Sequence, residues 1–263
     1  MKYYVVSDVH GFYTQLIKAL TDAGFFEEKE EHRLIVCGDM LDRGKEAKKV
    51  IDFMCDLKDA GKLIYIQGNH EELMLRCMHE ILQGDVYEIA SGASIHYRNR
   101  TWDTLLQISE MSPGEVCICP NEMIRRVRES RYYRELLPMC ENYFETEHYI
   151  FTHGWIPCHA HAVDYDVHYS YNPEWREAND TDWYRARWVN GMELACVHGI
   201  LEPGKTVVCG HWTASYGHSA IEKDGRGIWY TDSDFTPFRA DGIWAIDGSV
   251  AASGMLNCIV VED

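Results

Sequence analysis

The feature that most restricts the fold of this chain is an alternation of short apolar runs and amphipathic stretches between Met1 and Ile81. Tyr3–Val6, Leu34–Cys37 and Leu63–Ile66 have the apolar, β-branched and aromatic composition of strands that are buried on both faces. Between and after these runs, apolar residues recur at helical spacing. Strand–helix–strand units of roughly 30 residues are typical of a parallel sheet with helical crossovers. The sequence therefore predicts an α/β fold.

A different pattern begins after Gly84. Polar-rich segments with helical character, Asn99–Met111 and Asn121–Leu137, replace the alternation, and no strand is evident among them. We interpret residues 84–147 as a helical cap that is inserted into the α/β fold. A strand pattern returns at His148–Thr152.

The remaining sequence consists of an aromatic segment followed by short strands. Residues 155–203 are rich in Trp, Tyr and His and are predicted to form a second capping segment, in which the tryptophans are expected to pack in the core rather than to stack on a base. Short apolar runs separated by Gly and Asp then predict four strands, at Thr206–Cys209, Gly227–Tyr230, Gly242–Ile246 and Leu256–Val261. Since no repeat or low-complexity linker interrupts the chain, we expect residues 1–263 to fold as a single domain.

The charge of the chain argues against several classes of partner. It contains 25 Lys and Arg residues against 42 Asp and Glu residues, which gives a formal net charge of −17. Proteins that bind nucleic acids or anionic membrane surfaces use clustered positive charge, whereas this chain has an excess of negative charge. We therefore expect neither nucleic acid nor a membrane as a partner.

The same reading suggests a location for the protein. No apolar run approaches the roughly 18 residues of a membrane span, and the N-terminal run is too short for a signal peptide. The 10 cysteines form no CxxC pair and are expected to be reduced thiols, mostly buried, including Cys117 and Cys119. We expect a cytoplasmic protein.

Ligand-type side chains follow five of the predicted strands. In an open α/β sheet, ligands bind beyond the carboxyl ends of the strands, so side chains delivered there by several strands are aimed at one place. The five segments are Asp8-Val9-His10-Gly11, Gly38-Asp39-Met40-Leu41-Asp42-Arg43-Gly44, Gly68-Asn69-His70-Glu71, Thr152-His153-Gly154-Trp155 and Gly210-His211-Trp212.

The donor atoms in these segments favour a metal site. Carboxylate oxygen and imidazole nitrogen, without thiolate, suit Mn, Fe or Zn better than calcium or an iron–sulfur cluster. A shared carboxylate can bridge two metals roughly 3.5–4 Å apart, which is the geometry that clamps a phosphoryl group during in-line attack. Any one of these segments alone would be a weak signal, but five in succession are a strong one.

Taken in this order, the five segments resemble those of the binuclear metallophosphoesterases, in particular the branch with the serine/threonine protein phosphatases and the symmetrical dinucleoside tetraphosphatases. The resemblance extends from Asp8 to His211 and resumes weakly at Ile246-Asp247. It implies a metallophosphoesterase-type β-sandwich flanked by helices. It also implies two divalent metal ions, with Mn as the first choice and Fe or Zn as alternatives, and a metal-bound hydroxide as the nucleophile.

The resemblance further assigns metal ligands. One metal would be held by a group from the first two segments, and the second metal would share one carboxylate with it. The implied ligands are Asp8, His10 and Asp39 for the first metal, and the bridging Asp39 with Asn69, His153 and His211 for the second.

Catalytic and substrate-binding roles follow from the same resemblance. His70 would be the general acid, oriented by Asp42, and Arg43 would contact the phosphate. A second phosphate-binding arginine is expected between the last two histidine ligands, and we choose Arg187, with Arg185 as the alternative. A competing interpretation of His70 is that it merely caps its helix.

Three departures from the family pattern limit what the resemblance says about the substrate. Gln67 stands where the protein phosphatases usually have Arg, Trp155 replaces a usual glycine, and Gly210-His211-Trp212 is more similar to the tetraphosphatases. Our first expectation is hydrolysis of phosphoric monoesters, as in serine/threonine phosphatases. The alternatives are hydrolysis of symmetrical dinucleoside tetraphosphates and, in another class, an inactive metal-binding scaffold. The expected partner is a phosphorylated substrate, either a phosphoprotein or a nucleotide.

Overall fold

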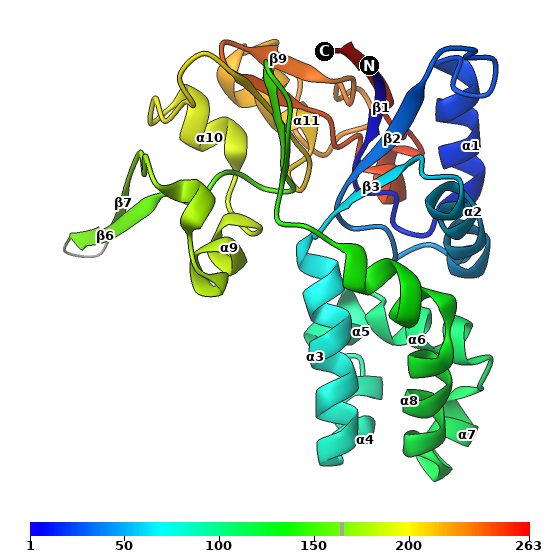
Figure 1. The fold of residues 1–263 in the computed structure, drawn as a ribbon. Helices are drawn as coiled ribbons and strands as arrows, with labels where there is room; N and C mark the ends of the chain where they lie inside the picture. Colours follow the sequence, from blue (N-terminus) through cyan, green and yellow to red (C-terminus); the bar gives the residue numbers. More distant parts are fainter. Residues whose placement is uncertain (164–165) are drawn as a thin grey trace.

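The computed structural model describes residues 1–163 and 166–263 and contains two β-sheets that face each other (Figure 1). The first sheet has the order β11-β1-β2-β3 and the second β4-β5-β8-β10-β9. The strands of the first sheet are β1 (Lys2–Val6), β2 (His32–Cys37), β3 (Leu63–Ile66) and β11 (Ile259–Glu262). Those of the second are β4 (Phe144–Glu145), β5 (Tyr149–Phe151), β8 (Thr206–Cys209), β9 (Phe238–Ala240) and β10 (Ile243–Ala245).

The central strands of both sheets run parallel, and antiparallel strands close the edges. β1, β2 and β3 pair in parallel, as do β5, β8 and β10, whereas β11, β4 and β9 pair antiparallel to their neighbours. Alternate residues of β1 and β2 point to opposite sides, and both sides are buried. This explains the continuous apolar runs that the sequence shows for these strands.

The core between the sheets contains side chains from both. Val5 and Ile35 of the first sheet pack in one cluster with Phe151 and Val208 of the second, which defines a sandwich. The predicted β-sandwich architecture is therefore confirmed.

Helices cover the outer face of the first sheet and extend into a helical lobe (Figure 1). A single apolar cluster runs from Val6 and Val36 on the sheet to Trp102 and Val127 in the lobe. The helices packed on the sheet are α1 (Tyr13–Asp22) and α2 (Ala47–Asp59), whereas α3 (Asn69–Gln83) runs away from the sheet into the lobe (Figure 1). The lobe continues with α4 (Val86–Ala90), α5 (Ile95–Arg98), α6 (Thr101–Ser109), α7 (Pro113–Ile118), α8 (Pro120–Glu129), a π-helical turn η1 (Tyr132–Leu136) and a 3₁₀ turn η2 (Leu137–Met139).

The outer face of the second sheet is covered by the aromatic segment. Trp155, Trp175 and Trp183 are buried in one cluster with Ile150 and Val207 of the sheet, as expected for core tryptophans. This region contains the hairpin β6 (His159–Val163) and β7 (Asp166–Ser170), then η3 (Trp175–Glu177), α9 (Asp180–Ala186) and α10 (Gly191–Cys196). Three short elements follow later in the chain: α11 (Ala214–Tyr216), η4 (Gly217–Ile221) and α12 (Val250–Ser253).

Several local expectations need correction. The predicted strand Gly227–Tyr230 is wrong: this segment pairs with no strand, and Trp229 and Tyr230 are exposed. Cys117 is only half-buried and Cys119 is exposed, so the expectation that both are buried is also wrong. The predicted helix Asn121–Leu137 is interrupted at Ser130, whose backbone is extended.

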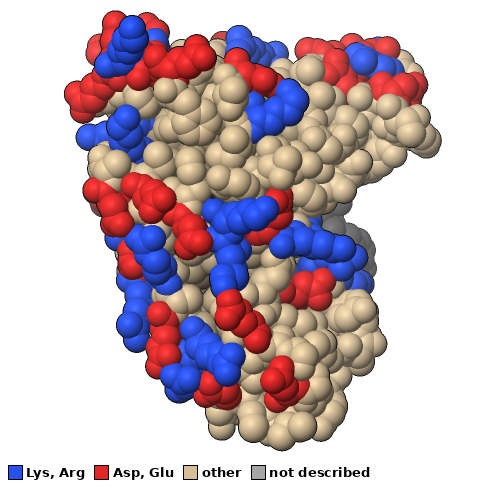
Figure 2. Space-filling view, turned by 90° about the vertical axis from the view of Figure 1, so that its right-hand side faces the viewer, with Lys and Arg blue, Asp and Glu red and all other residues tan. Residues whose placement is uncertain are grey.

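None of the helices in the described part of the chain has the length and hydrophobicity needed to cross a membrane. The face of the molecule drawn in Figure 2 has acidic and basic side chains mostly interspersed.

Candidate metal centre

The predicted metal ligands occupy a common position relative to their strands. Asp8, Asp39, His153 and His211 each lie two residues after the last residue of a parallel strand, β1, β2, β5 and β8 respectively. Asn69 lies three residues after β3, at the start of α3. Because these strands end at the same edge of the two facing sheets, all five side chains meet there.

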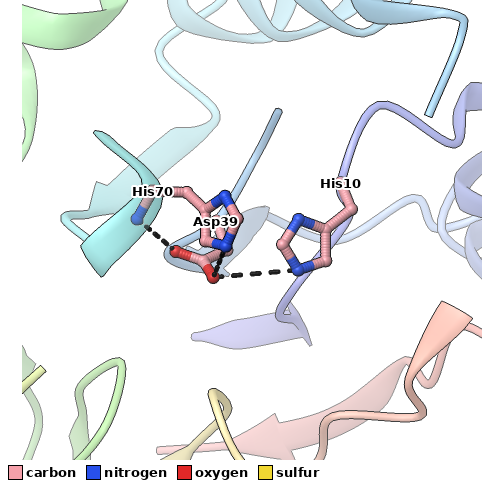
Figure 3. Close-up of side chains that lie close together, drawn as sticks. All are labelled: His10, Asp39 and His70. Carbon is pink, nitrogen blue, oxygen red and sulfur yellow. Dashed lines mark hydrogen bonds and ion pairs between the residues drawn. The ribbon is translucent and has the colours of Figure 1, made fainter. Parts of the chain in front are cut away.

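Two groups of donor atoms meet at Asp39. The first contains His10, Asp39 and His70, and the second contains Asp39, His153 and His211, with donor atoms in each group within 4.8 Å of one another. The Asp39 Oδ2 atom lies 3.7 Å from both His10 Nε2 and His70 Nε2 (Figure 3). On the other side, Asp39 Oδ1 lies 3.4 Å from His153 Nε2. Asp39 is thus the one carboxylate common to both groups.

Asp8 and Asn69 complete the surroundings of Asp39. Asp8 Oδ1 lies 3.8 Å from His10 Nε2, and Asp8 Oδ2 accepts a hydrogen bond of 2.9 Å from the backbone N–H of His211. Asn69 Oδ1 lies 2.8 Å from His153 Nε2. The structure therefore brings together all six predicted metal ligands.

Hydrogen bonds to backbone carbonyls orient two of the histidine rings. His10 Nδ1 lies 3.0 Å from the Leu41 carbonyl, and His153 Nδ1 lies 2.8 Å from the Cys37 carbonyl. When Nδ1 donates its proton to a carbonyl, the Nε2 lone pair is left facing the centre, which is the usual arrangement of histidine metal ligands.

This arrangement fits a cation. The His153 Nε2 and Asn69 Oδ1 atoms face each other at 2.8 Å. A metal ion between these loops could take a coordinate bond from each of the two atoms. The donor set of carboxylate, imidazole and amide oxygen suits Mn, Fe or Zn.

The electrostatics of the cluster also fit a bound cation. Burial raises the pKa of the Asp8 and Asp39 carboxyl groups, because little solvent reaches them to stabilise their charge. For each carboxyl group, a nearby acidic side chain raises the pKa further. Burial also holds the pKa of His10 and His211 well below the usual range, so both rings are neutral. Neutral imidazoles beside poorly compensated carboxylates are what a divalent cation requires.

His70 is placed differently from the other histidines. Its Nδ1 lies 2.7 Å from Asp42 Oδ2, which also accepts a hydrogen bond of 2.7 Å from Thr101 Oγ1. Burial alone would lower the pKa of His70, but the carboxylates of Asp39 and Asp42 outweigh burial and raise the pKa to about 9. The two carboxylates therefore favour the protonated form of the ring.

The helix-cap interpretation of His70 does not agree with the structure. The start of α3 is capped by Glu71, whose carboxylate accepts hydrogen bonds from the backbone of Gly68 at 2.7 Å and of Asp39 and Met40 at 3.1 Å. Glu71 thereby ties the loop after β2 to the loop after β3. It lies in the Gly-Asn-His-Glu motif, but the sequence analysis gave it no role.

Two glycines permit the close approach of these loops. A Cβ atom on Gly68 would lie 2.2 Å from Asp39 Oδ1, and one on Gly38, whose φ is +78°, would lie 2.5 Å from His153 Nδ1. Any side chain at either position would displace a predicted ligand.

The backbone of the site is held in an unusual conformation. Six predicted site residues other than glycine have a left-handed backbone, with φ values between 51° and 75°: Asp8, His10, Asp39, Asp42, Arg43 and His211. Each such residue costs of the order of 1 kcal/mol or more, and such strain clusters at functional sites.

The predicted arginines have contrasting environments. Arg43 is exposed, and its Nη2 atom lies 3.4 Å from His70 Nε2. Arg187 is buried, and its guanidinium is bound by Glu72, by Asn142 and, at 3.1 Å, by Gln67. In the described residues its side chain makes no hydrogen bond or ion pair with a predicted metal ligand, although its backbone lies against Gly154, next to His153. Arg185 is exposed and 3.6 Å from Asp182.

Two buried residues of the site received no role from the sequence. Asp247 lies two residues after the parallel strand β10, the same position as four of the ligands, and burial, then the nearby Asp8, raise its pKa to about 8. The predicted strand Gly242–Ile246 was a signal that could have identified it. Thr101 reaches Asp42 from the helical lobe, and no local pattern distinguishes it.

Comparison with known proteins agrees with this geometry. A family model described as calcineurin-like phosphoesterase matches residues 1–241. The asymmetrical bis(5'-nucleosyl)-tetraphosphatase PrpE of Bacillus velezensis is 24% identical over 139 residues, which are 51% of each chain. The enzyme of the same name from Bacillus subtilis is 30% identical over 121 residues, 44% of this chain and 45% of the relative. This chain thus spans about half the length of these curated relatives.

Further similarities are more limited. A symmetrical bis(5'-nucleosyl)-tetraphosphatase of Buchnera aphidicola subsp. Schizaphis graminum is 37% identical over 71 residues, 27% of this chain and 24% of the relative. A cold-active protein-tyrosine phosphatase of a psychrophilic Shewanella species is 17% identical, with a TM-score of 0.49, over 100% of this chain and 75% of that one. On the match over residues 1–241, the chain belongs to the calcineurin-like phosphoesterase family of metal-dependent hydrolases.

Proposed function

We propose that this chain hydrolyses phosphoric esters or anhydrides at a dinuclear metal centre. Asp8, His10 and Asp39 would hold one ion, and Asp39 would share the second with Asn69, His153 and His211. The observation that supports this proposal most directly is the position of Asp39, whose two carboxylate oxygens face separate groups of donors. A carboxylate in this position can bridge two ions.

The chain's own residues would bind the substrate and deliver a proton. When bound, two divalent ions would activate a water molecule for attack on phosphorus and neutralise the phosphoryl oxygens. Arg43 would hold one phosphoryl oxygen through its guanidinium. His70 would give its Nε2 proton to the leaving oxygen, while Asp42, itself fixed by Thr101, holds the ring through Nδ1. The Arg43 Nη2 and His70 Nε2 atoms lie 3.4 Å apart, so both can donate a hydrogen bond to a single substrate oxygen.

For the substrate we put dinucleoside tetraphosphates first. Several curated relatives are named as tetraphosphatases, some symmetrical and some asymmetrical. Hydrolysis would add water across one P–O–P bond, giving two nucleoside diphosphates from a symmetrical cut and a triphosphate with a monophosphate from an asymmetrical one.

Phosphoric monoesters, including phosphoproteins, are the second candidate. The observation in their favour is the contact of His70 with Asp42, which orients a proton donor, because an alkoxide leaving group needs a proton far more than a nucleotide does.

One experiment separates these candidates and tests the proposal. Purified full-length protein is loaded with Mn²⁺, Fe²⁺ or Zn²⁺, its metal content is measured, and turnover of diadenosine tetraphosphate and of a phosphoserine peptide is compared. We expect two ions per chain and faster turnover of the tetraphosphate, and chromatography of the products shows which bond is cut. Two ions per chain without turnover of either substrate would favour the inactive scaffold.

A further inference from the structure

A pocket lined by cations lies beside the candidate metal centre. Its volume is about 690 Å³, and the basic residues in its wall are Arg43 and Lys45 from the loop after β2, and Arg98 and Arg100 from the helical lobe. In a chain with 17 more acidic than basic charges, four cations around one pocket are an unexpected concentration.

Most of these cations have no acidic partner. Arg43, Lys45 and Arg98 have no carboxylate within 4 Å in the described residues, and Arg100 is paired with Asp103 at 2.9 Å. Glu46, the only acid in the wall, is already engaged by Thr14 at 3.0 Å and by Lys49 at 2.9 Å. Like charges held close together repel one another, so an anion bound between them would stabilise this cluster.

The pocket is continuous with the centre. Arg43 belongs to its wall and also lies 3.4 Å from His70. The next residue, Gly44, donates its backbone N–H to the His10 carbonyl at 2.8 Å, which fixes the loop against a predicted metal ligand. An anionic chain that is held at the centre by Arg43 can therefore extend toward Lys45, Arg98 and Arg100.

We propose that this pocket binds the continuing phosphate groups of a nucleoside polyphosphate substrate. The assignment rests on the proposed phosphohydrolase function and narrows it to substrates with several linked phosphates. Guanidinium groups bind phosphate in a bidentate way, and successive phosphoryl groups place a negative charge at each step of a short chain. An acidic peptide would need an extended basic groove, whereas these four cations line a single pocket.

The first test measures binding without turnover. Inorganic tripolyphosphate and orthophosphate are titrated into full-length, metal-free protein by calorimetry, for wild type, Arg98→Ala and the double variant Lys45→Ala/Arg98→Ala. We expect tripolyphosphate to bind more tightly than orthophosphate, and Arg98→Ala to weaken tripolyphosphate binding about tenfold. The matched control is Arg128→Ala, an exposed arginine of α8 without a salt bridge in the described residues, which should leave binding unchanged. Absence of tripolyphosphate binding, or equal losses in Arg98→Ala and Arg128→Ala, would overturn the assignment.

The second test uses the Mn-loaded enzyme. Arg98→Ala should lower the ratio of kcat/KM for diadenosine tetraphosphate to that for p-nitrophenyl phosphate about tenfold, mainly through KM. If a phosphoserine peptide with acidic neighbours loses as much as the tetraphosphate, the pocket is a peptide subsite and the polyphosphate assignment is wrong. If wild type turns over none of these substrates while tripolyphosphate binding still depends on Arg98, the proposed function fails and the anion pocket stands.

Discussion

The two facing sheets contribute different chemistry to the candidate centre. The first sheet supplies the carboxylates Asp8 and Asp39 together with His10, whereas the predicted ligands from the second sheet are the imidazole rings of His153 and His211. Contacts with the first sheet also hold these rings in place, because the His153 ring bonds to the Cys37 carbonyl and the His211 backbone to Asp8. The first sheet thus provides charge, and the second provides donors whose orientation depends on the first. Substitutions in the two sheets should therefore differ in effect.

The largest effect is expected for Asp39→Asn. Removing the charge of the shared carboxylate should weaken both ions and abolish activity, while the fold persists because the two side chains have the same shape. Elemental analysis of the purified variant, with circular dichroism for the fold, measures this. Asp42→Asn is the matched control and should retain both ions. Two tightly bound ions in Asp39→Asn would contradict the bridging assignment.

A ligand from the second sheet should have a narrower effect. In His211→Asn we expect one ion to remain, on Asp8, His10 and Asp39, and activity to fall by about 10²-fold or more, since two-metal chemistry needs both ions. Metal titration followed by calorimetry gives the stoichiometry. Loss of both ions would contradict the proposed difference between the sheets, because the first ion would then depend on the second sheet as well.

His70 should affect the reaction without affecting the metals. A positioned general acid contributes about 10²–10⁴-fold where the leaving group needs a proton. His70→Asn should therefore lower kcat strongly for a phosphoserine peptide and much less for p-nitrophenyl phosphate, whose leaving group departs nearly unaided. Equal losses for both substrates, with chemistry rate-limiting, would remove His70 from the role of acid.

Arg187 tests whether a buried arginine next to the second sheet binds substrate. As a phosphate clamp, Arg187→Ala should raise KM and lower kcat about tenfold, and Arg185→Ala should do much less. The structure adds a second consequence: Glu72, Gln67 and Asn142 lose their donor, so we expect unfolding stability to fall by about 2 kcal/mol. Lower stability with unchanged kinetic constants would mean that Arg187 only holds these loops together.

The smallest effect concerns a link between the sheets at the opposite edge. His148, just before β5, lies 2.5 Å from Asp263, just after β11, and this hydrogen bond raises the pKa of His148. Since the folded pKa is above the unfolded value, the pair contributes stability at pH values below about 6.5, and the contribution disappears as pH rises through the folded pKa. Denaturant unfolding should show this pH dependence in wild type and a weaker one in both Asp263→Asn and His148→Gln. An identical pH profile in the variants would show that the pair does not stabilise the docked sheets.

Much of the fold and of the centre could be predicted because the relevant signals are local. An apolar run followed by Asp or His predicts both a strand and a side chain that lies at the candidate centre, as for Asp8 and His153. Predictions failed where the structure depends on distant partners. Trp229 and Tyr230 have strand-type composition, but they pair with no strand in the described part of the chain, and they are exposed. The hairpin β6–β7 was not predicted as strands at all.

Contacts between residues that are far apart in the sequence could not be predicted either. Thr101 is 59 residues from Asp42, and the Arg187 guanidinium meets Gln67 from 120 residues away. The spacing of residues in the sequence does not predict such pairs, because they depend on how the helical lobe and the aromatic segment pack against the sheets.

Because the predicted ligands are divided between two sheets, the supply of metal would affect the stability of the folded protein. The second ion, whose proposed ligands come from both sheets, would bind the folded protein and not the unfolded one, so it would add folding free energy of about 2.7 kcal/mol at a hundredfold excess over its dissociation constant. When the metal becomes scarce, this contribution disappears and the unfolded fraction rises. A cell starved of the metal would then lose the protein itself to proteolysis, and not merely its activity.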